Sequence, residues 1–363
     1  MSTLRAAVVG CGQIADAHLQ AARSSGLATV VAVCDRCPDL ARQAALRFGV
    51  PYWQTDVDRM LDSARPDVVH ICTPPATHRD LLDRALDAGA HAYVEKPFAM
   101  SAAEGRQMLS NAAAAGHVVC AGHDRLFDPA WLECLARIRS GTIGTVRHIE
   151  FFQAYDLDGP FGRVFANDQS HWVWQLPGGL LYNAIPHGIA ALAALIPDEH
   201  PVVTSVPWHR SFQQSATELQ VLVRGSVTSA TLTFVTGTRP AGSYVRVHGD
   251  AGWLEVDFEA RTTRLRASSN LPGLVARIYV PWTSTRESAR MLARNLVRLV
   301  RGDLMHFAGL QHLVRLFYEA VISGGPSPID LSDVYRTCVL LDDVISGING
   351  THDLDRCDVV VPA

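Results

Sequence analysis

Lysine is almost absent from this sequence of 363 residues. Lysine and arginine together number 32, and Lys96 is the single lysine among them. Arginine is used wherever a surface positive charge suffices, so the exception indicates a position that needs a property arginine lacks. That property is an accessible deprotonated form, which makes Lys96 a candidate for proton chemistry. The alternative is that Lys96 is a chance survivor in an arginine-rich composition.

The sequence also has little net charge and no long uncharged apolar run. Charged residues make up 19% and the formal net charge is -4, which argues against the basic surface that nucleic acids or anionic membranes require. No stretch is apolar and long enough to span a bilayer, and the first residues lack the pattern of a signal peptide. We therefore expect a cytoplasmic protein with no nucleic-acid or membrane partner.

Paired cysteines and metal-ligand clusters are scarce as well. The eight cysteines are scattered, which is typical of reduced thiols rather than of a disulfide framework. Cys34 and Cys37 have the spacing of half a zinc site, but no second pair at matching spacing completes four ligands. We predict no metal.

The length and a hydrophobic content of 48% are sufficient for two domains. Short apolar runs alternate with helical patterns over residues 1–122, which predicts an α/β Rossmann domain with a doubly wound parallel sheet. The predicted strands are 6–9, 29–33, 68–72, 91–94 and 117–121, and the predicted helices are 14–24, 38–48, 77–88 and 102–115.

Residues 123–363 show a different pattern, typical of an α+β domain that binds substrate and forms oligomers. Period-two alternation over 202–267 predicts a large, mainly antiparallel sheet with one open face. The other predicted features are helices at 129–139, 185–195, 286–301, 306–323 and 332–346, a strand at 146–152 and a loop at 156–177.

A glycine turn follows the first predicted strand. Gly10, Gly12 and Ala15 form the pattern GxGxxA, in which Gly10 permits a tight turn and Gly12 lets the backbone approach a pyrophosphate. The phosphates would then lie at the N-terminus of the next helix, where free N–H groups favour negative charge. Gln13 and Ile14 complete the turn and belong to the same predicted cofactor site.

An acidic residue ends the second predicted strand, as a dinucleotide site requires. Asp35 is placed to bind both ribose hydroxyls, and its charge favours NAD because it would repel the 2'-phosphate of NADP. Arg36 keeps NADP open, since a neighbouring arginine could accommodate that phosphate.

Two more segments end predicted strands at the carboxyl edge of the sheet, where ligands bind in this architecture. Thr73 and Pro74 follow the third predicted strand, in a Thr-Pro-Pro run that permits only a rigid, extended loop. Glu95 and Lys96 follow the fourth. The single lysine therefore lies on the ligand-binding edge.

These motifs resemble the Gfo/Idh/MocA family, the glucose-fructose oxidoreductase and inositol dehydrogenase group, over nearly the whole chain. Glu95-Lys96-Pro97 is the most specific match, and His78 belongs to the predicted cofactor site with it. In the family the Lys-Pro bond is often cis and the lysine reaches the substrate hydroxyl beside the nicotinamide. The matching segments are 10–15, Asp35, 73–75 with His78, 95–97, 125–129, 141–144, 178–187 and 249–252.

Many family members carry an aspartate four residues before a histidine on the first long helix of the second domain, facing that lysine. This sequence has Asn183 and His187 instead, at a spacing that puts both on one helix face. Asparagine cannot accept a proton, so we expect Asn183 to hydrogen bond to substrate or to His187. The resemblance then implies His187 as general base, Lys96 as the amine that positions or shares the proton, and Asn183 as the orienting residue.

An aromatic residue in the 156–177 loop is a further candidate for substrate binding. Trp172 offers a face that suits the apolar side of a sugar ring, or it packs under the sheet.

The resemblance implies an NAD(P)-dependent dehydrogenase or reductase acting on CH–OH groups. Hydride would pass between nicotinamide and a secondary alcohol or ketone of a sugar, nucleotide-sugar or cyclitol. Two alternatives stay open: a glycosidase-type enzyme that recycles its NAD, and a non-catalytic dimer that senses NAD. The open sheet face commonly forms dimers and tetramers in this family, so we expect a homodimer or homotetramer through it.

Overall fold

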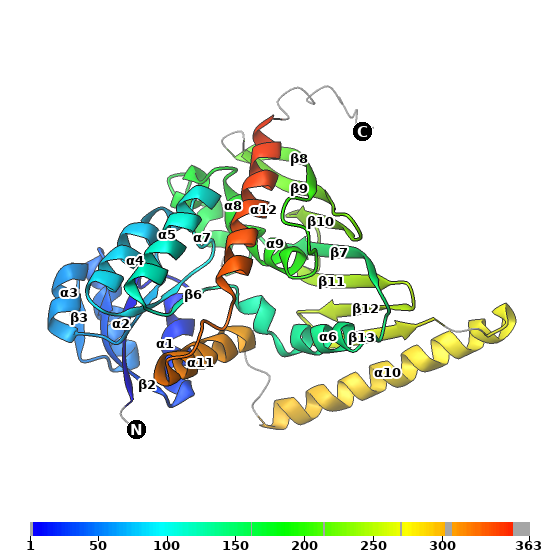
Figure 1. Cartoon of the computed structure of the whole chain (residues 1–363), viewed down its shortest axis with the longest axis horizontal. Coiled ribbons are helices and arrows are strands. Elements are labelled where there is room, and N and C mark those ends of the chain that lie inside the picture. Colours follow the sequence, from blue (N-terminus) through cyan, green and yellow to red (C-terminus); the bar gives the residue numbers. More distant parts are fainter. Residues whose placement is uncertain (1–2, 161, 213–214, 269–270, 302–306, 351–363) are drawn as a thin grey trace.

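The computed structural model describes residues 3–160, 162–212, 215–268, 271–301 and 307–350. Its first sheet has six parallel strands in the order β3-β2-β1-β4-β5-β6, which is the order of a Rossmann domain (Figure 1). The strands are β1 (Leu4–Val9), β2 (Ala28–Cys34), β3 (Tyr52–Gln54), β4 (Val68–Ile71), β5 (His91–Val94) and β6 (Val119–Ala121). The helices between them are α1 (Ala15–Ser25), α2 (Pro38–Phe48), α3 (Val57–Ala64), η1 (Pro75–Thr77), α4 (His78–Asp87) and α5 (Ala102–Ala115).

The strands of this sheet are short apolar runs because both faces are covered. All four residues of β4 are buried, as are the last four of β1. The pattern did not reveal β3 and α3, since β3 has three residues, none of them fully buried, and α3 has only eight. The parallel, doubly wound class predicted for the first domain is confirmed.

The second sheet has seven strands in the order β13-β12-β11-β7-β10-β9-β8 (Figure 1). All neighbouring pairs are antiparallel except β7 and β10, which are parallel. The strands are β7 (Val146–Ala154), β8 (Val202–Phe212), β9 (Ser215–Arg224), β10 (Ser229–Val235), β11 (Gly242–Gly249), β12 (Gly252–Asp257) and β13 (Thr262–Ala267).

Helices from three parts of the chain cover one face of this sheet. The helix α9 (Pro186–Ala193) contacts β7, α12 (Leu331–Gly350) contacts β8, and α6 (Pro129–Arg139) contacts β12 and β13. On the central strand β7, Ile149 and Phe151 point into this core and are buried, whereas Glu150 and Phe152 on the other face are half-exposed. The α+β class with a mainly antiparallel, open-faced sheet is therefore confirmed.

The helix predicted at 185–195 is found as α9, and a separate short helix that was not predicted precedes it. The helix α8 (Leu180–Ala184) ends before Ile185, and α9 begins at Pro186. Proline has no backbone N–H to continue the hydrogen bonds of the preceding turn, so the break falls in front of it. The predicted loop 156–177 contains the short helices α7 (Gly162–Ala166) and η3 (Trp172–Gln175).

The helix α11 (Ala308–Ser323) returns to the Rossmann domain. It packs on α1, and Leu313, Phe317 and Tyr318 join the core beneath the parallel sheet. The domain boundary at residue 122 stays a prediction, and this packing means that the C-terminal part of the chain contributes to both cores.

The helix α10 (Gly273–Arg301) begins well before the predicted residue 286 and extends along the edge of the second sheet (Figure 1). Pro281 lies within it, and an interior proline normally signals the end of a helix, which is why the pattern missed the first part. No described helix is long and apolar enough to cross a membrane.

Candidate active site

Lys96 joins the edge of the Rossmann sheet to the second domain. It follows β5, and its Nζ donates to the backbone oxygen of Asn183 at 3.2 Å and to the amide Oδ1 of the same residue at 3.3 Å. Burial lowers the pKa of Lys96, and the negative charges of Glu95 and Asp124 offset part of that shift. The amine is therefore easier to deprotonate than an exposed lysine, which is the property proposed for it from the sequence.

His187 lies one turn after Asn183 but does not pair with it. Its Nδ1 is 3.5 Å from Oδ1 of Asp124, a residue of the short helix η2 (Asp124–Phe127) after β6. Both side chains are mostly buried, with exposed fractions of 17% and 19%. Asn183 was expected to hydrogen bond to substrate or to His187, but its amide oxygen accepts from Lys96 instead. The carboxylate beside the histidine comes from another element.

Burial sets the protonation of this pair. It lowers the pKa of His187 well below its usual value, and the positive charges of Arg125 and Lys96 lower it further. Burial also raises the pKa of Asp124 to about 6, with a second contribution from Glu95. At neutral pH the imidazole is therefore neutral, as a general base requires, and the carboxylate is mostly ionised.

Glu95 points into the Rossmann core and not toward the ligand edge. It accepts from the backbone N of Lys96 at 3.1 Å and lies 2.9 Å from Nε2 of His18, whose Nδ1 contacts His70 at 3.0 Å. His70 in turn lies 2.7 Å from the hydroxyl of Tyr318 in α11. Burial alone would raise the pKa of Glu95, but His18 and Lys96 lower it overall, so this buried chain holds an ionised carboxylate directly before the lysine.

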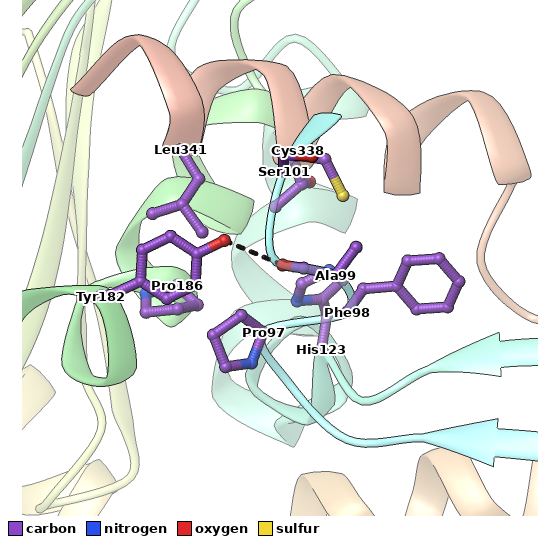
Figure 2. A pocket seen from close by; sticks show the side chains of 10 residues that line it. Pro97, Phe98, Ala99, Ser101, His123, Tyr182, Pro186, Cys338 and Leu341 are labelled. Atoms are coloured by element: carbon purple, nitrogen blue, oxygen red, sulfur yellow. Dashed lines mark hydrogen bonds between the residues drawn. The ribbon is translucent and has the colours of Figure 1, made fainter. Parts of the chain in front are cut away.

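A small pocket lies behind the segment that carries Lys96. The Lys96–Pro97 peptide is cis, as the resemblance implied. Figure 2 shows Pro97 and Ala99 facing Tyr182 and Pro186 of α8 and α9, with α12 above them. The hydroxyl of Tyr182 donates to the backbone oxygen of Ala99 at 2.9 Å (Figure 2). This bond ties the Lys96 segment to the helix that carries Asn183.

The glycine turn leaves room for a phosphate group. Gly10 has φ +91°, and a Cβ there would lie 2.7 Å from the backbone of Cys72, so only glycine fits. A Cβ on Gly12 would meet nothing within 4 Å, which leaves open space beside its backbone. Ile14 precedes α1 and provides no side-chain cap, so no side chain occupies the N-terminus of that helix, where the helix dipole favours an anion. The turn therefore fits a pyrophosphate.

Asp35 is anchored by the backbone around the predicted ribose site. Its two oxygens accept from the backbone N of Cys11 at 2.7 Å and of Cys37 at 2.8 Å. Each carboxylate oxygen keeps a second lone pair, so the residue can still accept from ribose hydroxyls. Arg36 is exposed beside it.

The other predicted cofactor residues take two kinds of position. Gln13 is exposed and donates to the backbone oxygen of Pro160, which links the glycine turn to the second domain at 3.3 Å. Thr73 and Pro74 follow β4 at the ligand edge. His78 is fully buried between the backbone oxygens of Thr73 and Phe98, so any effect on a cofactor would be through the loops it holds.

Trp172 takes the second of its two predicted positions, packed against the second domain, and Asp124 is a site residue that the sequence analysis did not identify. Trp172 is half-buried, contacts the ring of His171 and packs against the second core. Asp124 was not among the predicted site residues, although it follows β6 at the same carboxyl edge as Lys96, and that position could have drawn attention to it. In the part of the chain that is described, no group of three or more His, Cys, Asp or Glu side chains is arranged so that it could hold a metal ion.

Comparison with known proteins agrees with this geometry. The model of the oxidoreductase family with an NAD-binding Rossmann fold, Gfo/Idh/MocA, matches residues 4–123, which include the glycine turn, Asp35 and Lys96. Residues 4–123 thus resemble the NAD-binding domain of the Gfo/Idh/MocA family.

Among relatives, the chain is 30% identical over 219 residues to D-glucoside 3-dehydrogenase of Escherichia coli K12, covering 60% of each chain. It is 32% identical over 142 residues to scyllo-inositol 2-dehydrogenase (NAD(+)) of Bacillus subtilis, covering 39% of this chain and 42% of the relative. The chain thus spans about half the length of the curated relatives that it matches.

Solved structures of similar fold cover almost the whole chain. Levoglucosan dehydrogenase in complex with NADH and L-sorbose superposes with a TM-score of 0.76 at 17% identity, covering 96% of this chain and 97% of the other. The WlbA dehydrogenase from Bordetella pertussis, in complex with NADH and UDP-GlcNAcA, superposes with a TM-score of 0.76 at 18% identity, covering 96% of each chain. At these identities the likeness shows the fold alone, over nearly the whole chain.

Proposed function

We propose that this protein is an NAD-dependent oxidoreductase that transfers hydride between nicotinamide and a secondary alcohol or ketone of a sugar or cyclitol. The observation that carries the proposal is the cluster at the carboxyl edge of the Rossmann sheet. There the amine of Lys96 contacts Asn183, the neutral imidazole of His187 contacts Asp124, and the uncapped N-terminus of α1 follows β1 at the same sheet edge.

The proposed chemistry needs a base for the hydroxyl proton and a group that orients the hydroxyl. His187 faces Asp124 with Nδ1, so Nε2 is the nitrogen left to accept the proton from substrate. The lowered pKa of Lys96 allows its amine to hydrogen bond to the same hydroxyl and to share its proton. A bound nicotinamide supplies the acceptor or donor of the hydride. General acid-base help of this kind contributes roughly 10² to 10⁴ in rate.

The proposed cofactor preference rests on Asp35, whose carboxylate would bind ribose hydroxyls and repel a 2'-phosphate. The proposed substrate class is supported by the names of the relatives, a D-glucoside 3-dehydrogenase and a scyllo-inositol 2-dehydrogenase. Nucleotide-sugars belong to the same proposal, since one protein of similar fold was solved with UDP-GlcNAcA.

Catalysis is tested by following absorbance at the NADH wavelength with the purified protein, NAD or NADP, and a panel of sugars, nucleotide-sugars and cyclitols. We expect one substrate group to reduce free NAD stoichiometrically, with NADP bound more weakly. The His187→Asn variant should lose about 10² or more of this turnover while binding NAD normally, because only the base is removed.

The same assay separates the two other readings of the sequence. A glycosidase-type enzyme would cleave a glycoside while its bound cofactor returns unchanged, so product would form without net NADH. A non-catalytic NAD sensor would bind NAD tightly and turn over none of the panel. Either result, or equal turnover by the His187→Asn variant, would contradict the proposed hydride transfer.

A further inference from the structure

Asp124 is the acidic residue that faces the imidazole of His187. Its Oδ1 lies 3.5 Å from Nδ1, and both atoms are buried without a hydrogen-bond partner among the described residues, so each is the nearest polar group available to the other. The two groups come from separate elements, η2 after β6 and α9 in the second domain, so their approach depends on the packing of η2 against α9.

Asn183, four residues before His187, does not provide a negative charge beside the imidazole. Its side chain is a neutral amide, and its Oδ1 accepts from Nζ of Lys96 at 3.3 Å. The amide therefore contacts the lysine, and neither α8 nor α9 provides an anion for an imidazolium formed at His187. The carboxylate that the structure places beside His187 is that of Asp124.

We propose that Asp124 is the positioning residue for His187, holding the proton on Nδ1 so that Nε2 is free to act as base and offsetting the charge of the imidazolium that forms. This inference rests on the proposed function of His187. A carboxylate that accepts from one ring nitrogen selects the tautomer with its lone pair on the other, and it stabilises the protonated ring.

The positive groups around His187 oppose its protonation, so an imidazolium there needs a neighbouring anion. Lys96, Arg125 and His123 each disfavour a positive charge on His187, as does burial. Glu95 lies on the far side of Lys96 and is paired with His18 in the Rossmann core. Among these groups, Asp124 is the carboxylate in direct reach of the imidazole, so its removal should weaken the base.

The first test compares the pH profiles of turnover for the unaltered protein and for Asp124→Asn, which keeps shape and removes charge. We expect a plateau about 10-fold or more lower, with the acid limb moved to lower pH. The direction follows because an anion favours the charged imidazolium, so without it His187 stays neutral to lower pH. An unchanged plateau and limb would overturn the proposal.

Rescue distinguishes a positioning role from a merely structural one. The Asp124→Glu variant keeps the negative charge at this position, whereas Asp124→Asn removes it. We expect Asp124→Glu to retain at least about 10-fold more turnover than Asp124→Asn and to keep the acid limb at higher pH. Turnover and an acid limb no different from those of Asp124→Asn would count against Asp124 acting through its charge.

Asp128 offers a matched control on the same segment. It is a buried aspartate whose Oδ1 accepts from the backbone N of Ala130 as the N-cap of α6. Asparagine caps a helix about as well as aspartate, so Asp128→Asn should keep the fold, the plateau and the acid limb. A shifted limb in this control would mean that any charge removed from the segment has the same effect, which would contradict a specific pair.

A measurement that does not depend on turnover tests the role of Asp124 separately from the proposed function. In protein labelled with ¹⁵N-histidine, the signals of His187 are identified by their loss in His187→Asn, and its tautomer and titration follow from their shifts. We expect a proton on Nδ1 in the unaltered protein, and a lower titration point with a weaker tautomer preference in Asp124→Asn. If these changes occur but no hydride transfer is found, the pairing of Asp124 with His187 is supported and the proposed enzymatic function is contradicted. If hydride transfer occurs without these changes, the proposed pairing is contradicted.

Discussion

At the scale of single residues, the chemistry of the site depends on the hydrogen bonds and the burial of each side chain. Lys96 donates to two oxygens of Asn183, and burial lowers its pKa, so the neutral amine forms more readily than in an exposed lysine. The distances of 3.2 and 3.3 Å suit a compact ammonium group at this point. A guanidinium would spread its donors over a wider, flat group and stay charged at any working pH.

The Lys96→Arg variant tests this difference directly. Because the variant keeps the positive charge, we expect a folded protein that binds NAD. Because the guanidinium cannot release a proton, we expect turnover to fall about 10²-fold or more. The melting temperature and an NAD titration serve as controls, because a damaged fold would change both. Near-normal turnover would mean that a positive charge is sufficient at this position, and Lys96 would then be a chance survivor of the arginine-rich composition.

At the scale of elements, α10 has two faces of opposite character. Met291 is 7% exposed on the face toward the second sheet, where Glu287 accepts from the backbone N of Leu265 at 3.0 Å. Arg294 on the same face contacts Glu133 of α6. The opposite face is apolar and exposed, and its residues include Leu274, Ile278, Trp282, Leu292, Leu296 and Val300.

Substitutions at two neighbouring residues of α10 test how much each face contributes to stability. Met291→Ala removes a buried side chain and should lower the free energy of unfolding by about 2 kcal/mol or more. Leu292 is 63% exposed, so Leu292→Ala should change it by less than about 0.5 kcal/mol. Urea denaturation at low protein concentration measures both. Equal losses would mean that the outer face of α10 is covered in solution.

At the scale of the whole molecule, the open face of the second sheet is the surface proposed for a homodimer or homotetramer. Phe152 on the central strand β7 stacks on Tyr244, and Arg246 lies over the rings of Tyr244 and Trp253. Aromatic residues and arginine are enriched in protein interfaces, particularly where they are half-buried in this way.

Light scattering coupled to size-exclusion chromatography tests this interface. Phe152→Arg places a charge at the centre of the open face and should convert the oligomer to a monomer without loss of fold, because the residue lies outside the core. Ile278→Arg places the same charge on the exposed face of α10 and should leave the mass unchanged. If only Ile278→Arg dissociates the protein, the subunits associate through α10 and the proposal for the sheet is wrong.

The sequence by itself determined the two fold classes and the cofactor turn, because these follow from local rules. Buried parallel strands appear as short apolar runs, and an open-faced sheet appears as period-two alternation. Gly10 and Gly12 could be assigned from their place between a strand and a helix, and Lys96 from its rarity and its position after β5. Short or interrupted elements such as β3, α3 and the first part of α10 gave too weak a periodic signal.

Only the tertiary structure decided which residues meet. Helical spacing suggested that Asn183 and His187 act together, but the break before Pro186 and the packing of η2 place Asn183 on Lys96 and Asp124 beside His187. Asp124 and His187 are far apart in the sequence, so no periodicity connects them. The pKa directions of Lys96, Asp124 and His187 likewise arise from burial between two domains, which no single segment of the chain contains.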